Sequence, residues 1–208
     1  MKLPEKLVFA TNNAHKLQEA RAIIDSMCKA TNQRCKVLSL SDINCKDDIA
    51  EEAETLEGNA LLKSQWVASH YGCDCFADDT GLEVDALGGM PGVHTARYAA
   101  LADSEAASHD SDANMRLLLK NLENTDNRKA QFRTAIALII NGEEHVFEGK
   151  VEGSIARQPS GKEGFGYDPV FIPDGYDICF AEMPPEQKNS LSHRSRALKA
   201  MMQFFEEK

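Results

Sequence analysis

The sequence predicts an α/β fold, in which a mixed twisted sheet with flanking helices forms two lobes around a central cleft. In the first half, short apolar runs alternate with amphipathic segments, which is typical of strands alternating with helices in a parallel sheet. In the second half the pattern changes to a long β-hairpin. The chain has 208 residues, of which 42% are hydrophobic. This length and composition fit one large domain made of two intimately packed lobes.

The first half contains five expected elements. The run at 7–10 is apolar throughout, as expected for a strand buried on both faces. In the next segment, apolar residues recur at three- and four-residue steps and predict an amphipathic helix. The expected elements are strands at 7–10, 37–38 and 75–77 and helices at 14–29 and 55–71, with Thr55 as N-cap. In such folds, ligands gather at the carboxyl ends of the strands.

The second half is organised around a hairpin. Asn141 and Gly142 form its expected turn, because both turn positions favour residues that accept positive φ. The other expected elements are helices at 110–122 and 190–206, hairpin strands at 132–140 and 145–150 with the return strand extending to 155, and a short strand at 169–172.

Charge and composition narrow the classes of function. The net charge of −10 argues against sequence-independent binding of nucleic acid, which needs an electropositive surface. A small phosphate-bearing ligand is compatible with it, because a few local cations and a metal ion outweigh the global field. No apolar run approaches the ~20 residues of a membrane span, and the N-terminus lacks a signal-peptide core. We expect a cytoplasmic protein with six reduced cysteines and no zinc site, since C-x2-C spacing is absent.

Two adjacent carboxylates, Asp78 and Asp79, are the most informative pair in the chain. They follow the apolar run at 75–77 and enter a glycine-rich loop, so we expect them to be exposed at a strand end. Such a pair binds a divalent metal or includes a proton-abstracting carboxylate, and an Asx-type turn that ends a strand is the alternative. Glu51, in an acidic stretch, could supply a further oxygen to magnesium.

Two further segments could bind a ligand. The turn at 11–16 lies between the first strand and the first helix, where free amides and Lys16 favour an anion, although a plain capped turn fits equally. The segment 165–168 offers aromatic faces beside Asp168, and near the last helix Lys188, His193 and Arg194 supply hydrogen-bond donors. For these groups, a glycine-punctuated loop and ordinary surface charge are the alternatives.

Taken together, these segments resemble the family of non-canonical purine nucleoside triphosphate pyrophosphatases, also called inosine triphosphate pyrophosphatases. The matching segments are 11–16, the acidic stretch ending in Asn59, Ala60 and Lys63, then 77–98, 164–169 and 188–194. The resemblance implies hydrolysis of ITP, dITP or XTP to the monophosphate and pyrophosphate, with Mg²⁺ (one or more divalent ions) as cofactor. It also implies a homodimer that binds a nucleotide, with no nucleic-acid or membrane partner.

The resemblance also implies roles for individual residues. Asp79 would be the general base and a metal ligand, Glu51 a second metal ligand, and Asp78 and Arg97 helpers. The residues implied to bind the nucleotide are Thr11, Asn12, Asn13, Ala14, His15, Lys16, Lys63, Thr80, Phe165, Gly166, Tyr167, Asp168, Lys188, His193 and Arg194. His193 and Arg194 would donate to the 6-oxo group of the base, an acceptor that adenine lacks.

The sequence departs from the family pattern at two positions. Asn12 stands where the family usually has glycine, and asparagine is well suited to replace glycine in left-handed geometry. Gly58 stands where glutamate often precedes the Asn-Ala pair.

Two other classes of function are considered. An aspartyl-phosphate phosphatase needs a second aspartate two positions after Asp78, where Thr80 stands. A non-catalytic nucleotide sensor would use the same groups without turnover.

Overall fold

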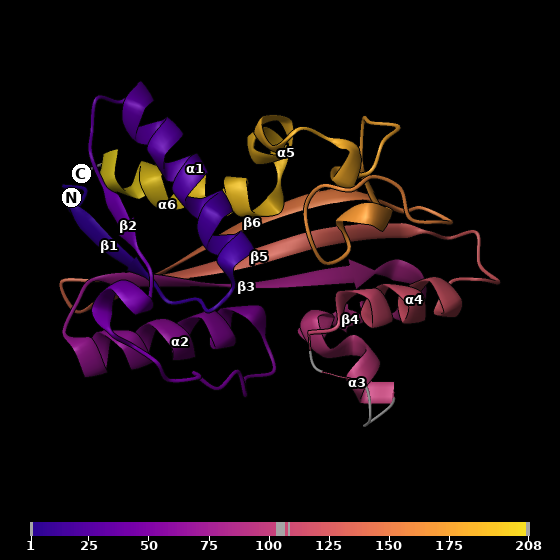
Figure 1. The fold of residues 1–208 in the computed structure, drawn as a ribbon, viewed down its shortest axis with the longest axis horizontal. Coiled ribbons are helices and arrows are strands. Elements are labelled where there is room, and N and C mark those ends of the chain that lie inside the picture. Colours follow the sequence, from indigo (N-terminus) through magenta and orange to yellow (C-terminus); the bar gives the residue numbers. More distant parts are fainter. Residues whose placement is uncertain (1, 103–106, 108, 207–208) are drawn as a thin grey trace. The chain divides into compact units, whose positions relative to one another are not determined.

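The computed structural model describes residues 2–102, 107 and 109–206 (Figure 1). Its chain divides into two compact units. The first unit consists of Met1–Asp79, Thr134–Gly149 and His193–Lys208, and the second of Thr80–Arg133 and Lys150–Ser192.

Within the described residues, seven strands form one mixed sheet of order β2-β1-β3-β5-β6-β7, with β4 pairing with β3. The strands are β1 Lys6–Phe9, β2 Lys36–Leu38, β3 Cys75–Val84, β4 Pro91–Gly92, β5 Lys129–Ile140, β6 Glu143–Ile155 and β7 Phe171–Pro173. β1 pairs in parallel with β2 and β3, whereas the β3–β4 and β6–β7 pairs are antiparallel. The expected mixed α/β sheet is confirmed.

The helices follow the expected order with additions. The α-helices are α1 Ala14–Ala30, α2 Leu56–Tyr71, α3 Tyr98–Ala102, α4 Ser111–Asn121, α5 Pro185–Leu191 and α6 His193–Glu206. Short 3-10 helices are η1 Ser41–Ile43, η2 Asp85–Leu87, η3 Thr95–Arg97, η4 Asp168–Val170 and η5 Phe180–Glu182. No helix in the described part of the chain is long and apolar enough to cross a bilayer.

Local signals placed several boundaries correctly. The Asn13 side chain accepts from the amides of the first turn of α1, and Thr55 caps α2 in the same way. Asn141 and Gly142 have φ of 51° and 80°, which confirms the turn of the β5–β6 hairpin.

In the first unit, helices cover both faces of the sheet. Successive side chains of a strand point to opposite faces, and the core follows this alternation. On one face, Leu7, Phe9 and Phe76 pack with residues of α1 and α6. On the other face, Cys75 and Ala77 pack with α2 residues. Figure 1 shows α1 and α6 on one side of β3 and α2 on the other. Side chains at even and odd positions of β3 therefore meet different helices.

The second unit has its own apolar core. Leu82 of β3 and Phe132 of β5 pack there with Leu118 of α4 and with Phe171 and Phe180. Phe132 and Phe171 meet with ring centroids 4.7 Å apart. This core positions η4 and α5, which carry Asp168 and Lys188.

Two expectations about segment ends were wrong. The strand expected at 75–77 continues as β3 to Val84, so Asp78 and Asp79 lie inside a strand. They are also buried, with 1% and 7% of their surface exposed, and are not at an exposed strand end. A charged pair followed by Thr-Gly is typical of a turn, but here β4 pairs with the later part of β3 and prolongs it.

The other differences are smaller. The helix expected at 190–206 is two helices, because Ser192 adopts extended backbone between α5 and α6. The strand expected at 169–172 begins later, at Phe171, after the 3-10 turn η4. The short helix α3 was not expected from the sequence.

Candidate active site

The acidic pair is divided between the two faces of the sheet in the first unit. Asp78 follows Phe76 in alternation and shares the face covered by α1 and α6, whereas Asp79 follows Ala77 and shares the face covered by α2. The carboxylates therefore make hydrogen bonds to different helices, although Lys16 and Lys63 act electrostatically on both. Their sequence adjacency does not make them a carboxylate dyad.

Asp78 lies in a buried ion-pair network. Its Oδ1 accepts from Lys16 Nζ of α1 at 3.0 Å, and its Oδ2 accepts from Arg194 Nε of α6 at 2.9 Å. The Arg194 guanidinium also donates from Nη1 to Glu19 of α1. Asp78 and Arg194 are each 1% exposed. This network joins the first turns of α1 and α6 to the centre of the sheet.

Asp79 faces the first turns of α2. Its Oδ2 accepts from Asn59 Nδ2 at 3.1 Å. Lys63, one helical turn further along α2, donates to the backbone oxygen of Asp78 at 2.7 Å and to the Glu51 carboxylate. Asp79, Lys63 and Glu51 thus belong to one cluster in the first unit.

The protonation equilibria differ between the two aspartates. Burial alone would raise the pKa of Asp78, but Lys16, Arg194 and Lys63 outweigh it and hold that pKa well below the usual range. Burial raises the pKa of Asp79, and the attraction of Lys63 and Lys16 offsets only part of this effect. Asp79 is therefore the better proton acceptor of the two.

The lysine and the glutamate of the cluster are held in their charged forms. Burial opposes the charge of Lys63, but Asp79, Glu51 and Asp78 raise its pKa above the ordinary value. Burial likewise disfavours the Glu51 carboxylate, but Lys63 lowers the pKa of Glu51 overall. The cluster therefore contains a stable ammonium beside two carboxylates.

The turn at 11–16 is a capped helix start. The amides of His15 and Lys16 donate to Asn13 Oδ1 at 3.0 and 3.1 Å. Asn12, Asn13, Ala14 and His15 are exposed, so an oxygen-rich ligand can reach this end of α1. Asn12 does not have a positive φ. The turn therefore needs no left-handed residue at this position, where the family usually has glycine.

In the second unit, Asp168 and Lys188 form a buried ion pair. Lys188 Nζ lies 2.6 Å from Asp168 Oδ2, which also accepts from the Phe165 amide at 2.8 Å. The same ammonium lies 5.0 Å from the centroid of the Phe165 ring. Tyr167 is buried and donates its hydroxyl hydrogen to Thr95 O. The expected set of Phe165, Asp168 and Lys188 is thus together in this unit.

The remaining predicted residues are placed separately. His193 is the buried first residue of α6, next to Arg194 in the first unit. Thr80 on β3, Gly166 and Arg97 of η3 belong to the second unit, and Thr80 and Arg97 are half-buried. Arg194 was expected to bind the base, and its Nε and Nη1 atoms are directed at carboxylates.

Asn59 and Glu19 contact predicted groups but were not among the predicted site residues. Asn59 bonds Asp79, and Glu19 bonds Arg194. Helical spacing could have drawn attention to both, since Glu19 follows Lys16 by three residues and Asn59 precedes Lys63 by four. Their partners, however, are distant in the sequence.

The residues present fit one mode of magnesium binding, in which the protein supplies few ligands. The described residues include no group of three His, Cys, Asp or Glu side chains placed to hold a metal. Magnesium commonly binds proteins through one or two carboxylates and takes its other ligands from water and phosphates. Glu51 and Asp79 carry carboxylate oxygens and interact electrostatically within one cluster, so their side chains fit this mode of binding.

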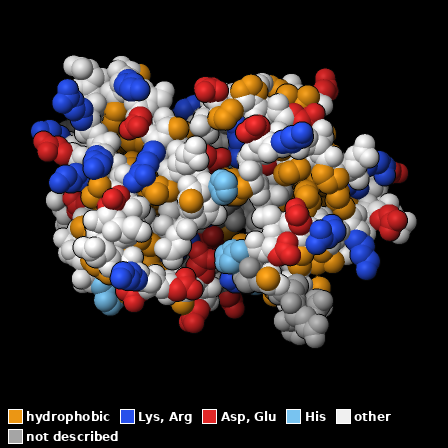
Figure 2. Space-filling view, in the orientation of Figure 1, with side chains coloured by type: hydrophobic (Ala, Val, Ile, Leu, Met, Phe, Trp, Pro, Cys, Tyr) orange, Lys and Arg blue, Asp and Glu red, His pale blue; other side chains and the backbone are white. Residues whose placement is uncertain are grey.

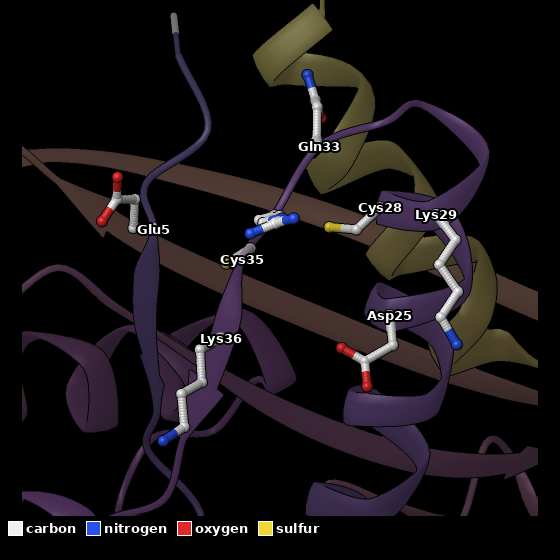
Figure 3. A pocket seen from close by; sticks show the side chains of 8 residues that line it. Glu5, Asp25, Cys28, Lys29, Gln33, Cys35 and Lys36 are labelled. Atoms are coloured by element: carbon white, nitrogen blue, oxygen red, sulfur yellow. The ribbon is translucent and has the colours of Figure 1, made fainter.

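A pocket elsewhere in the first unit is separate from these groups. It has a volume of about 640 Å³ and lies beside the end of α1 and the start of β2 (Figure 3). Its lining residues are Glu5, Asp25, Cys28, Lys29, Gln33, Arg34, Cys35 and Lys36. Burial raises the pKa of Cys28, and it raises that of Cys35 to about 12, so both thiols are poor nucleophiles.

Comparison with known proteins defines the class of this fold and site. The Ham1 family matches residues 7–204. The chain is 51% identical over 201 residues to the dITP/XTP pyrophosphatase of Porphyromonas gingivalis, covering 96% of this chain and 97% of the relative. It is 47% identical to the dITP/XTP pyrophosphatase of Flavobacterium johnsoniae, covering 95% and 96%. The chain belongs to the Ham1 family.

Solved structures agree with this assignment. The structure of the Staphylococcus aureus Ham1 protein matches with a TM-score of 0.82 and 36% identity, covering 97% of this chain and 98% of the other. A nucleoside-triphosphatase, dITP/XTP pyrophosphatase, from Mycobacterium abscessus matches with a TM-score of 0.71 and 40% identity, covering 95% and 98%. The predicted fold class and family are confirmed.

Proposed function

We propose that this protein hydrolyses the non-canonical purine nucleotides ITP, dITP and XTP to the monophosphate and pyrophosphate, and so removes them from the nucleotide pool. Relatives that are 51% and 47% identical are named dITP/XTP pyrophosphatase. The observation that carries the proposal is the cluster at β3, where buried Asp79 is held by Asn59 beside Lys63 and Glu51. Such a cluster suits phosphoryl transfer, in which positioning and charge stabilisation dominate.

In the proposed reaction, Asp79 orients a water molecule and accepts its proton as the water oxygen bonds to the α-phosphorus. The bond from that phosphorus to the bridging oxygen breaks, and pyrophosphate leaves. Glu51 and Asp79 would hold Mg²⁺, which when bound neutralises negative charge on phosphate oxygens. Lys63, Lys16 and the start of α1 bind the phosphates and stabilise the same charge.

Charge balance in the first unit supports a role for a divalent cation. The carboxylates of Asp78, Asp79, Glu51 and Glu19 lie among the cations Lys16, Lys63 and Arg194. These groups alone do not form a positive site for a triphosphate. A divalent ion reverses the sign of the local charge and permits a polyanion to bind.

We assign the base to the buried set of the second unit. The Phe165 ring offers a stacking face, and Asp168 and Lys188 provide an acceptor and a donor. The 6-oxo group of these purines, which adenine lacks, accepts from such a donor. A site whose donors bind this oxygen can discriminate against a nucleotide that lacks it by about 10⁴–10⁵-fold.

We further propose that the protein is a homodimer in the cytoplasm, without nucleic-acid or membrane partners. Acidic and basic side chains are interspersed on the face seen in Figure 2, which gives no continuous basic surface there for nucleic acid. Light scattering tests the dimer.

The decisive experiment is incubation with ITP, XTP, dITP, ATP or GTP in the presence of Mg²⁺, with pyrophosphate and orthophosphate assayed separately. We expect pyrophosphate from ITP, dITP and XTP and little product from ATP. Release of orthophosphate would instead support a phosphatase, and binding of ITP without product would support a sensor. Either result would refute the proposal.

Substitution of the proposed base tests the mechanism. Asp79→Asn should keep the fold and lower kcat by about 10²–10⁴-fold, because general-base catalysis typically contributes that much. Asp126→Asn is the matched control, since Asp126 is 99% exposed and pairs only with exposed Arg157 in the described structure. Near-normal turnover by Asp79→Asn would remove Asp79 from the catalytic role.

A further inference from the structure

The segment that carries Glu51 has no regular secondary structure. Residues 45–53 form neither helix nor strand, and α2 begins only at Leu56. The position of the Glu51 carboxylate therefore depends on side-chain contacts with neighbouring elements. One of these is the ion pair with Lys63, which in the proposed reaction is drawn to phosphate oxygens.

The second contact runs through Asn59. Its Oδ1 accepts from the amide of Ala53 at 2.9 Å, two residues after Glu51, and its Nδ2 donates to Asp79 Oδ2 at 3.1 Å. Asn59 is 1% exposed, and its bond to Asp79 is buried, whereas its bond to Ala53 is part-buried. One neutral side chain thus connects the backbone beside one candidate metal ligand to the carboxylate of the other.

Gly58 permits this connection in this chain. A Cβ placed on Gly58 would lie 2.7 Å from Ala53 Cβ and 3.0 Å from Thr55 Oγ1. The segment therefore packs against the first turn of α2 more closely than an alanine at position 58 would allow. Ala53 Cβ is attached directly to the backbone, so relief of the contact requires movement of the segment itself.

We propose that Asn59 is a positioning residue that holds Glu51 and Asp79 in a fixed relation for a divalent cation, and that Gly58 allows the close approach on which this bridge depends. The inference rests on the proposed function, because that function assigns the cation to these two carboxylates. Groups that hold metal ligands in this indirect way are typically worth 10–100-fold in metal affinity or activity.

The test measures Mn²⁺ binding in the absence of nucleotide, by electron paramagnetic resonance, alongside pyrophosphate release from ITP. Asn59→Leu removes both hydrogen bonds at similar volume and should weaken Mn²⁺ binding by about 10-fold or more. The matched control is Asn114→Leu in the second unit. Asn114 is also buried and also bridges two groups, accepting from the Ala99 amide at 2.7 Å and donating to Ala96 O at 3.0 Å. The Asn114→Leu variant should lose about as much thermal stability as Asn59→Leu but keep its Mn²⁺ affinity within about twofold of the wild-type value.

A second pair of variants does not depend on the loss of a buried amide. Gly58→Ala favours the helix by its intrinsic propensity, so the variant should fold. It should nevertheless weaken Mn²⁺ binding, because the added methyl displaces Ala53. Adding Ala53→Gly removes the opposing methyl and should restore most of the affinity.

The outcomes separate this inference from the proposed function. The positioning role would be overturned if folded Asn59→Leu bound Mn²⁺ with wild-type affinity, or if Asn114→Leu lost as much Mn²⁺ affinity as Asn59→Leu. It would also be overturned if adding Ala53→Gly to Gly58→Ala did not restore Mn²⁺ affinity. A wild-type protein that binds no Mn²⁺ would overturn it as well, since there would be no metal pair to position. Failure of the wild-type protein to release pyrophosphate from ITP would refute the proposed function, and the metal titrations do not depend on that result.

Discussion

Substitution of Asp78 by asparagine tests whether this residue acts mainly through structure. The change keeps the shape of the side chain and removes the charge that faces Lys16 and Arg194. Asp78 and Arg194 are almost completely buried, whereas Lys16 retains 15% of its side-chain exposure. Arg194 would keep its second partner, Glu19. The expected consequence is a loss of stability, with Arg194 left partly compensated.

The magnitude follows from the contact distances. Two unit charges about 3 Å apart attract by roughly 5–6 kcal/mol at an effective dielectric constant of about 20. Desolvation cancels part of this attraction, and removal of one partner of a buried pair typically costs about 3–5 kcal/mol. Because Glu19 still neutralises Arg194, we expect the free energy of unfolding of Asp78→Asn to fall by about 3 kcal/mol at pH 7.

The effect should depend on pH in a defined direction. The pKa of Asp78 in the folded protein lies below its value in the unfolded chain, which is about 4. The charge of Asp78 therefore contributes its full stability above pH ~4. That contribution declines as the pH falls below this value and disappears at the folded pKa. The difference between the wild-type protein and Asp78→Asn should shrink accordingly in acid.

Urea titration provides the assay. Trp66 on α2 is the single tryptophan and stacks on His70 at 4.1 Å, so its fluorescence reports on the first unit, while circular dichroism follows the whole chain. Asp126→Asn serves as the control and should leave the midpoint unchanged, because exposed ion pairs contribute little. An unchanged midpoint for Asp78→Asn at pH 7, or a difference that grows in acid, would refute the reasoning.

Two further predictions concern packing and the second unit. Gly149→Ala should lower the free energy of unfolding by about 1–3 kcal/mol in urea titration, because its Cβ would lie 2.2 Å from His193 O and push α6 from β6. An unchanged midpoint would contradict this close approach. Lys188→Met should raise KM for ITP by about tenfold with a smaller change in kcat, since it removes the partner of Asp168 in the proposed base-binding set. A loss confined to kcat would contradict a binding role.

The order of elements could be predicted from the sequence because it depends on local patterns. The apolar run at 7–10, the polar turn that follows it and the cap Thr55 placed β1, α1 and α2 within a residue or two. The turn at Asn141 and Gly142 placed the β5–β6 hairpin. The break at Ser192 was missed because Lys188–Arg194 contains no proline or glycine to end a helix.

The groupings of site residues were only partly predictable. The resemblance to the family implied that Glu51 and Asp79 bind one metal and that Lys63 binds phosphate, and the structure places all three in one cluster. Asn59 and Glu19 were not among the predicted site residues, because helical spacing places them beside Lys63 and Lys16 but does not reveal hydrogen-bond partners far away in the sequence.

The sequence by itself determined the family, the α/β class and the presence of an acidic pair directly after an apolar run. Only the tertiary structure decided that Asp78 and Asp79 serve opposite faces of the sheet. β3 runs from Cys75 to Val84 and so includes both residues, and strand alternation directs one carboxylate to α1 and α6 and the other to α2. Adjacent residues acquire different partners because their side chains leave the sheet in opposite directions.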